Sequence, residues 1–371
     1  MKISYFSSAI LPSRTANSIH VMKMCNALSK LSHDVTLYAP DVDCGIEANV
    51  ENIFDFYGVG EAFKIIKTYY PNIKGRAYIS SYLAVRKSLK NGIDLSFSRN
   101  LLAAYLCARN NIPTVFEIHQ PVSSYGYTAR ILFNQLVRSK SFKKLVVITK
   151  SLESYFLKLY PQLSGKIIVA PDAADPSPEN IKPLDLRTGQ RLMVGYVGQL
   201  YSGKGMELIS KLCRLMPSVD FHIVGGVDKD IAKWRKETEG ADNIFYHGFL
   251  PHAQVSRFIN EFDVVLLPNQ RSVATHGGRH DIGEWTSPLK MFEYMAAGKA
   301  IVSSDLPVLQ EVLKQDFNAK LCSPDDVNDW VIAINELGDE GARKRLADNA
   351  KLDFIQKYTW QTRAKTVLLS I

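Results

Sequence analysis

The sequence lacks several features that would place it in a special class of protein. No apolar run approaches the ~20 residues that a membrane-spanning helix needs, and the amino-terminal stretch turns polar after a few residues. Five scattered cysteines without CxxC spacing predict neither a disulfide framework nor a zinc site. No long polar or low-complexity tract indicates disorder. We therefore expect a folded cytoplasmic protein that is neither exported nor integral to a membrane.

What the sequence does contain suits two hydrophobic cores. Its 371 residues, 46% of them hydrophobic, predict two domains of roughly 150 to 200 residues each. The net charge of +8 lies in the first part of the chain, because residues 1–180 hold 21 Lys and Arg against 13 Asp and Glu. Such an excess indicates an anionic partner, such as a membrane surface, a pyrophosphate-linked acceptor or nucleic acid, or else an ordinary solvated surface.

Short apolar runs alternate with amphipathic helical patterns along the whole chain. Strands are expected at 3–6, 35–39, 94–98, 114–118, 145–148 and 167–169, and again at 192–197, 221–224, 244–246, 264–267 and 300–302. A proline-rich segment at 171–183 is the predicted linker. This pattern predicts the α/β class, with two doubly wound parallel-sheet domains, residues 1–175 and 190–355, that face each other across a cleft.

A glycine-containing turn follows the expected strand at 192–197. Gly198, Gly203 and Gly205 surround Lys204 just before a helical pattern at 206–215. Glycines let backbone N–H groups approach phosphate oxygens, and a helix start adds partial positive charge. The turn lacks the Ser or Thr after lysine with which a P-loop holds magnesium. By itself it therefore predicts either a phosphate site or an ordinary helix start with a solvated lysine.

A second segment, residues 287–302, points to the same chemistry. Ser287 is expected to cap a helix whose first residue is Pro288 and which ends near Gly298. Glu293 lies on an otherwise apolar stretch of this helix, so its carboxylate needs a partner. That partner could be a ribose diol or a neighbouring Lys or Arg.

Together these segments resemble the nucleotide-sugar signature of glycosyltransferase family 4, the retaining enzymes of the GT-B fold. The matching stretches are 198–205, 287–296, 249–251 with 262–268, 116–119, 98–100 and 358–360. In that family the closing helix folds back onto the first domain, so residues 356–371 are expected to pack against residues 1–175.

The resemblance implies roles for individual residues. Lys204 would bind the donor diphosphate, Glu293 the ribose and His119 the donor sugar near the reacting carbon, which makes these three the expected catalytic residues. The other expected donor-binding residues are Gly198, Gln199, Gly203, Gly225, Glu284, Ser287, Pro288, Leu289 and Lys290. The expected acceptor-binding residues are Ser13, Arg14, Asn17, His20 and Arg99. No metal and no cofactor are expected besides a UDP- or GDP-linked sugar as the donor substrate.

The sequence departs from the family pattern at two positions of the donor site. Trp285 stands where the family often has a first glutamate, and the nearest carboxylate is that of Glu284. Gln199 stands where an arginine is usual, so a second cation must come from elsewhere. The candidates for that cation are Lys290, Arg271 and Arg279.

Two further patterns have competing interpretations. Asp41 and Asp43 spell the Asp-x-Asp of a manganese-binding glycosyltransferase fold, but they follow a strand and Pro40, so we expect a solvated loop. Lysines, tyrosines and an arginine alternate over residues 64–76. They predict a loop with an ordinary basic helix, a nucleic-acid contact or, as we favour, a membrane headgroup interface.

The function expected from these observations is retaining, metal-independent transfer of a hexose from a nucleotide-diphosphate sugar. The acceptor would be a glycan or a polyprenyl-linked molecule, in surface polysaccharide or glycoconjugate synthesis at the inner face of the plasma membrane. We expect no nucleic acid partner. The alternatives are a sugar-nucleotide epimerase of the same fold and a non-catalytic partner subunit.

Overall fold

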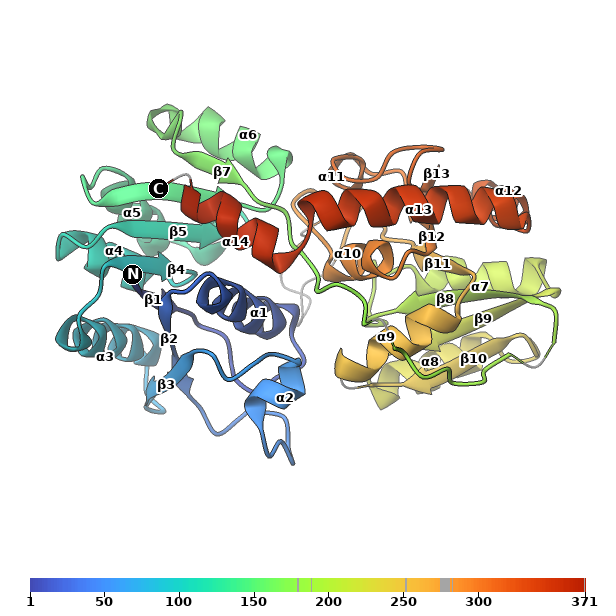
Figure 1. Ribbon diagram of the computed structural model, residues 1–371, viewed down its shortest axis with the longest axis horizontal. Helices are drawn as coiled ribbons and strands as arrows, with labels where there is room; N and C mark the ends of the chain where they lie inside the picture. Colours follow the sequence, from blue (N-terminus) through green and yellow to red (C-terminus); the bar gives the residue numbers. More distant parts are fainter. Residues whose placement is uncertain (179, 188, 251, 274–280, 282, 370) are drawn as a thin grey trace. The chain divides into compact units, whose positions relative to one another are not determined.

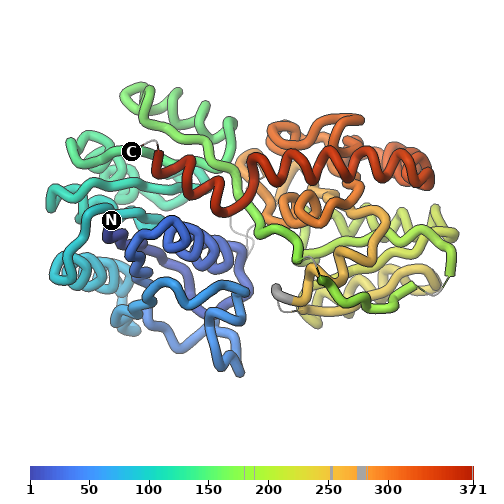
Figure 2. Tube along the Cα trace, viewed as in Figure 1, coloured from blue at the N-terminus to red at the C-terminus, as the bar shows by residue number. Residues whose placement is uncertain are grey.

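The computed structural model of the chain (Figure 1) describes residues 1–178, 180–187, 189–250, 252–273, 281, 283–369 and 371. It divides into two compact units. Unit 1 comprises Met1–Pro171 together with Trp360–Ile371, and unit 2 comprises Asp172–Thr359. Each unit contains one parallel β-sheet flanked by helices, and Figure 2 traces the path of the chain through them.

Unit 1 contains a seven-stranded sheet among its described residues, in the order β3-β2-β1-β4-β5-β6-β7. Its strands are β1 (Lys2–Phe6), β2 (Asp34–Asp41), β3 (Lys64–Tyr69), β4 (Leu95–Ser98), β5 (Thr114–Ile118), β6 (Phe142–Val147) and β7 (Ile167–Val169). Its helices are α1 (Ala16–Lys30), α2 (Ile53–Tyr57), α3 (Arg76–Asn91), α4 (Leu101–Arg109), α5 (Tyr127–Val137), α6 (Lys150–Leu159) and α14 (Trp360–Leu369), with 3₁₀ turns η1 (Val122–Tyr125) and η2 (Pro161–Leu163). The order reverses between β1 and β4, where doubly wound sheets place their ligands.

Unit 2 repeats this winding with a six-stranded sheet, in the order β10-β9-β8-β11-β12-β13. Its strands are β8 (Leu192–Val197), β9 (Val219–Val224), β10 (Ile244–Gly248), β11 (Val264–Leu267), β12 (Ala300–Ser304) and β13 (Lys320–Cys322). Its helices are α7 (Met206–Leu215), α8 (Asp228–Glu237), α9 (His252–Glu261), α10 (Leu289–Ala296), α11 (Pro307–Gln310), α12 (Val327–Glu336) and α13 (Glu340–Lys357). The reversal lies between β8 and β11.

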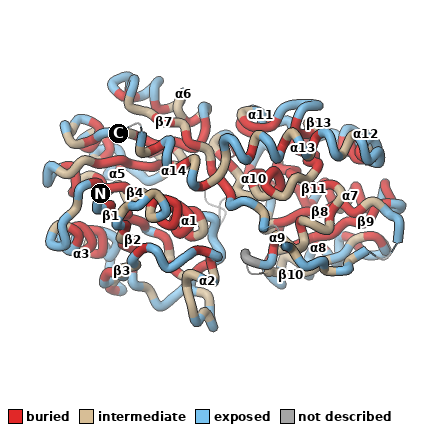
Figure 3. Tube along the Cα trace, in the orientation of Figure 1, coloured by how far each residue is buried: buried red, intermediate tan, exposed pale blue. Residues whose placement is uncertain are grey.

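The central strands are buried because helices cover both faces of each sheet. β4, β5 and β11 are buried at every position, as expected for parallel strands that read as continuous apolar runs. In Figure 3 the inner strands of both sheets are largely red, whereas the outer sides of the helices are pale blue. The cores therefore fix the strand ends from which the loops of the candidate site emerge.

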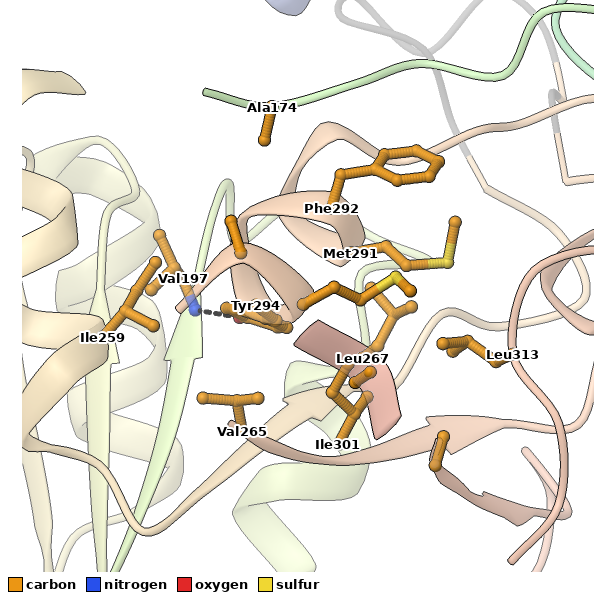
Figure 4. Packing of buried hydrophobic residues seen from close by; sticks show 14 of the residues in the cluster. Ala174, Val197, Ile259, Val265, Leu267, Met291, Phe292, Tyr294, Ile301 and Leu313 are labelled. Atoms are coloured by element: carbon orange, nitrogen blue, oxygen red, sulfur yellow. Dashed lines mark hydrogen bonds between the residues drawn. The ribbon is translucent and has the colours of Figure 1, made fainter. Parts of the chain in front are cut away.

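Helix α10 is anchored to the sheet of unit 2 by its apolar residues. Met291, Phe292 and Tyr294 belong to one buried cluster with Val265 and Leu267 of β11 (Figure 4). The hydroxyl of Tyr294 accepts a hydrogen bond of 2.8 Å from the backbone N–H of Val197, the last residue of β8. This bond fixes α10 beside the loop that follows β8.

The expected fold class, two doubly wound α/β domains, is confirmed. The alternative interpretation of residues 64–76, a loop with a basic helix, was partly wrong. Residues 64–69 form the edge strand β3, which pairs in parallel with β2, and α3 begins only at Arg76. Lysines at the solvent-facing edge hide the strand pattern, and such charges protect an edge from pairing with other chains. Asp41 is the last residue of β2, and Asp43 lies in the following loop.

Among the described residues, no helix is both long enough and apolar enough to span a membrane.

Candidate active site

The loop after β8 presents bare backbone at the carboxyl end of the sheet of unit 2. The N–H of Gly198 donates to the carbonyl of Val224 (2.9 Å). Gly225 follows that residue with a φ of +112°, and a Cβ on it would lie 2.3 Å from the Gly198 carbonyl oxygen. A side chain cannot fit there. The structure thus brings together two of the expected donor-binding glycines at adjacent strand ends.

The turn from Gln199 to Gly205 leads directly into α7. The hydroxyl of Tyr196 donates to the Gln199 carbonyl (2.7 Å), so this carbonyl points into the unit. At Gly203, φ is +85° and a Cβ would lie 2.3 Å from the Ser272 carbonyl oxygen. Gly205 precedes α7, and no side chain caps this helix. The first N–H groups of α7 are therefore available to an anion.

Two lysines bring positive charge to this loop. Burial lowers the pKa of Lys204 from its usual 10.5 to about 8. Burial, and then repulsion by Lys204, holds the pKa of Lys290 well below its usual range, although Glu293 opposes the shift. Burial disfavours the charged form of both amines, and Lys204 further disfavours that of Lys290, so the pair favours a ligand that brings negative charge.

Lys290 has no hydrogen-bond partner within the described part of the chain. Its Nζ is buried and lies 3.9 Å from the centroid of the Tyr196 ring. A Cβ placed on Gly198 would lie 3.4 Å from this nitrogen, so the amine faces the loop after β8. An aromatic face favours a cation but supplies no hydrogen-bond acceptor.

The expected cap of α10 was wrong. Pro288, not Ser287, is the residue before the helix, which begins at Leu289. The Ser287 hydroxyl instead accepts a hydrogen bond of 3.0 Å from the backbone N–H of Asp172. Both residues are buried, so this bond satisfies a donor that burial would otherwise leave unpaired. No side chain caps α10. Its first N–H groups, like those of α7, are therefore available as hydrogen-bond donors to an anion.

Glu293 and Glu284 have different surroundings. Glu293 is half-buried on α10, and its charge acts on Lys290. Glu284 is exposed in the turn before α10. The structure therefore brings Glu293 into the group formed by Gly198, Lys204 and Lys290, whereas it leaves Glu284 at the surface.

The other candidates for the second cation differ from Lys290. Arg271 pairs with Asp325 (2.8 Å), and both side chains are largely exposed. Arg279 lies outside the described residues. Among the described candidates, Lys290 is thus the one whose charge is buried and not neutralised by a carboxylate at hydrogen-bond distance.

In unit 1, a buried carboxylate lies at the centre of a cluster of basic side chains. Oε1 of Glu117 lies 2.8 Å from Nε2 of His20, 2.6 Å from Nε2 of His119 and 3.0 Å from a guanidinium nitrogen of Arg363. Burial alone would raise the pKa of Glu117, but Arg363, His20 and His119 hold this pKa well below its usual range. Glu117 is therefore ionised and fully paired.

Both ring nitrogens of His119 are engaged. A guanidinium nitrogen of Arg99 lies 3.0 Å from Nδ1, and guanidinium can only donate, so Nδ1 must accept. The ring proton then lies on Nε2, which donates to Glu117. This arrangement fixes His119 as one neutral tautomer and leaves it no free nitrogen with which to exchange a proton.

The same cluster does not suit a metal ion. The ligand atoms of His20, Glu117 and His119 lie within 4.8 Å of one another, which is close enough for a metal site. A metal would need the Nε2 lone pair of His119, however, and Arg99 forces the proton onto that atom. The Arg363 guanidinium also binds the carboxylate oxygen that would be a ligand.

The remaining residues expected to bind the acceptor are divided between surface and interior. Ser13 is buried, and its hydroxyl lies 3.1 Å from the hydroxyls of Thr15 and Ser18. Arg14 pairs with Glu47. Asn17 is exposed on the first turn of α1. The structure therefore gathers His20 and Arg99 around His119, but does not bring Ser13 into that cluster.

The sequence motifs did not assign a role to Arg363 or to Glu117. Arg363 of α14 is 3% exposed and donates to the carbonyls of Ala170 and Pro171 besides Glu117. One signal in the sequence could have found this pair. Glu117 is a charged residue in the middle of an apolar strand, and a buried carboxylate requires a partner.

Two family models match successive parts of the chain. The model described as Glycosyltransferase Family 4 matches residues 18–177, and the model described as Glycosyl transferases group 1 matches residues 178–353. The first match lies largely in unit 1, and the second lies within unit 2.

Curated proteins are also similar in sequence. The uncharacterized glycosyltransferase MJ1607 of Methanocaldococcus jannaschii is 25% identical over 179 residues, which are 47% of this chain and 43% of that protein. The amylovoran biosynthesis glycosyltransferase AmsK of Erwinia amylovora is 26% identical over 167 residues, 43% of this chain and 39% of that protein. The chain thus spans about two fifths of the length of the curated relatives it matches.

The fold is similar to that of a solved protein structure over the whole chain. The structure of Anabaena HepE in complex with UDP and glucose matches with a TM-score of 0.73 at 15% identity, covering 100% of this chain and 99% of that chain. The fold is therefore shared in full, although the sequences have diverged.

Proposed function

Because the chain belongs to glycosyltransferase family 4, we propose that it transfers a hexose from a nucleotide-diphosphate sugar to an acceptor. The observation that carries this proposal is the pair of buried amines, Lys204 and Lys290, beside the glycine loop after β8. An unpaired buried ammonium is costly. A diphosphate bound there supplies the missing negative charge.

The donor is proposed to be a uridine or guanosine diphosphate sugar held by unit 2. Lys204, Lys290 and the first N–H groups of α7 and α10 surround the diphosphate, and Glu293 accepts hydrogen bonds from the ribose hydroxyls. The HepE structure, which contains UDP and glucose, supports a uridine nucleotide.

The same groups would promote cleavage of the glycosidic bond. Negative charge builds up on the diphosphate as it leaves, and fixed donors aimed at this charge stabilise the transition state more than the ground state. Removing one such donor typically costs about 10²- to 10³-fold in rate. The two lysines supply the positive charge that a metal ion would otherwise provide, so we propose a metal-independent reaction.

Retention of configuration follows if the acceptor attacks from the side of the leaving group. In this mechanism a diphosphate oxygen takes the acceptor proton, and no protein base is needed. The fixed tautomer of His119 supports this assignment, because neither ring nitrogen is free to accept a proton. His119 then orients the sugar.

The acceptor is proposed to be a glycan or a polyprenyl-linked molecule presented at the inner face of the plasma membrane. Lys64, Lys67, Lys74 and Arg76 are exposed, as are the rings of Tyr69, Tyr78 and Tyr82, and we propose that these residues act together as what is here called the basic-aromatic surface. Basic and aromatic side chains together favour anionic headgroups. The name of AmsK, which refers to amylovoran biosynthesis, supports a role in surface polysaccharide synthesis.

Binding of nucleotides tests the proposal directly. A ligand bound only by the folded state raises its melting temperature, so a panel of nucleoside diphosphates and their sugars should show stabilisation by one nucleotide class. Lys204→Met and Glu293→Gln should lose this stabilisation. The control Lys211→Met, an exposed lysine on α7, should keep it.

Product analysis then separates transfer from its alternatives. Slow hydrolysis of the bound sugar nucleotide, lost in Lys204→Met, supports a transferase. An epimerised sugar would instead indicate an epimerase, and nucleotide binding without any turnover would indicate a partner subunit. If no nucleotide binds, or if Lys204→Met binds as tightly as Lys211→Met, the proposal is wrong.

A further inference from the structure

Unit 1 contains a cavity that none of the expected donor or acceptor residues lines. Its volume is about 150 Å³. It lies at the carboxyl ends of β1 and β2, against the first turns of α3, and its lining includes Phe6, Tyr38 and Asn100. Ligands of doubly wound sheets bind at the carboxyl ends of the strands. The position is therefore that of a binding pocket.

Asn100 holds two walls of the cavity together. Its amide nitrogen donates to the hydroxyls of Ser8 (3.0 Å) and Ser81 (2.9 Å), which come from the loop after β1 and from α3. Its amide oxygen accepts the N–H of Ala103. Both N–H donors of this amide are thus used, and its oxygen is bound to α4, so the two serines are fixed in place.

The hydroxyls of the lining retain free hydrogen-bonding capacity. The Ser81 hydroxyl donates to the carbonyl of Ala77 and accepts from Asn100, which leaves one lone pair. The hydroxyls of Thr68 and Ser80 bond to each other (2.7 Å) and retain lone pairs. Ser8 accepts from Asn100, and its own O–H remains to be donated. The cavity therefore offers fixed acceptors and a donor to the same ligand.

Most of the remaining lining is apolar or aromatic. Ile10, Pro40 and Val42 form part of the wall. At the mouth, the Arg76 guanidinium lies 5.1 Å from the centroid of the Tyr70 ring. A pyranose ring has hydroxyl groups at its edges and C–H groups on its faces. The side-chain hydroxyls of the cavity can bind such edges, and its apolar side chains can pack against such faces. A cavity of ~150 Å³ accommodates a six-membered ring.

We propose that this cavity binds one hexose unit of the acceptor glycan. The proposal rests on the proposed function, because it assigns the acceptor's chemical class. It places this hexose next to the residues around His119, since Asn100 directly follows Arg99 in the chain. The pocket is distinct from the residues expected to bind the acceptor, Ser13, Arg14, Asn17, His20 and Arg99, none of which lines it.

The test measures binding of simple sugars without requiring the natural acceptor. Saturation-transfer NMR is recorded with millimolar methyl glycosides of glucose, galactose, mannose and N-acetylglucosamine, with UDP present to occupy the donor site. We expect at least one glycoside to receive saturation. Ala77→Leu should lower this signal about tenfold, because Ala77 lines the cavity and is exposed at the start of α3, so leucine fills the space without disturbing the core.

The matched control is Ala62→Leu, which adds the same group at an exposed position of unit 1 outside the lining; it should bind as the parent does. The inference is overturned if no glycoside receives saturation, or if Ala77→Leu gives the signal of Ala62→Leu. Thermal stabilisation by UDP and by GDP is measured on the same samples. If UDP or GDP still stabilises a protein that binds no glycoside, only the sugar pocket is refuted. If neither nucleotide stabilises the protein, the proposed function is refuted.

Discussion

Replacing Lys204 by methionine should stabilise the ligand-free protein while abolishing nucleotide binding. Methionine keeps an unbranched side chain but removes the charge. Burial lowers the Lys204 pKa from 10.5 to about 8, and each pKa unit corresponds to ~1.4 kcal/mol between the two protonation states. The folded state therefore bears a cost of at most about 3.5 kcal/mol at neutral pH. We expect Lys204→Met to raise the free energy of unfolding by about 1 to 3 kcal/mol.

The sign of the pH dependence follows from the lowered pKa. Below about pH 8 both states hold the proton, and the cost is fully present. Between about pH 8 and 10.5 the folded protein has released the proton while the unfolded chain still holds it, so the stability of the parent rises with pH. The difference in the free energy of unfolding between Lys204→Met and the parent should accordingly shrink as the pH approaches 10.5.

Urea unfolding at neutral and alkaline pH measures this difference, with Lys211→Met as the control on the same helix. Lys211 is exposed, so its replacement should change stability by no more than ~0.5 kcal/mol. The reasoning is refuted if Lys204→Met is no more stable than Lys211→Met at neutral pH. It is equally refuted if the gap between the variants does not change with pH.

Three further predictions follow from charges in the two units. UDP affinity should fall as the pH rises above about 8, where Lys204 loses its proton, and calorimetry in buffers of different ionisation enthalpy should show proton uptake on binding; no uptake contradicts the lowered pKa. Arg363→Met should cost about 3 to 5 kcal/mol in urea unfolding, because the buried carboxylate of Glu117 loses its guanidinium partner and keeps only the two histidines; a loss below 1 kcal/mol contradicts this pairing. Replacing Lys64 and Lys67 with glutamine should reduce sedimentation with anionic vesicles but not with neutral ones, whereas equal loss on both would argue against an electrostatic contact.

The features predicted well from the sequence depend on neighbouring residues. The strand at 192–197 and the helix at 206–215 have the expected bounds, because continuous apolar runs and a 3.6-residue period are local signals. Gly203 and Lys204 were placed in the loop between them for the same reason. Edge strand β3 was missed, since Lys64 and Lys67 interrupt its apolar pattern.

The features that the sequence did not reveal depend on residues far apart in the chain. Ser287 bonds to Asp172, which is 115 positions away, so a helix cap was the natural but wrong expectation. Arg363 and Glu117 are separated by 246 positions, and no local pattern links them. The sequence offered both Lys290 and Arg271 as the second cation. Only the structure shows that Arg271 pairs with Asp325, whereas Lys290 has no hydrogen-bond partner among the described residues.

The origin of α14 has a consequence for biosynthesis. Unit 1 is discontinuous in sequence, and its segment Trp360–Ile371 is synthesised only after all of unit 2. Until Arg363 leaves the ribosome, the carboxylate of Glu117 lacks its guanidinium partner and must remain hydrated or protonated. Unit 1, which is begun first, thus cannot finish folding until unit 2 has been synthesised, so deleting Trp360–Ile371 should leave an incomplete unit 1.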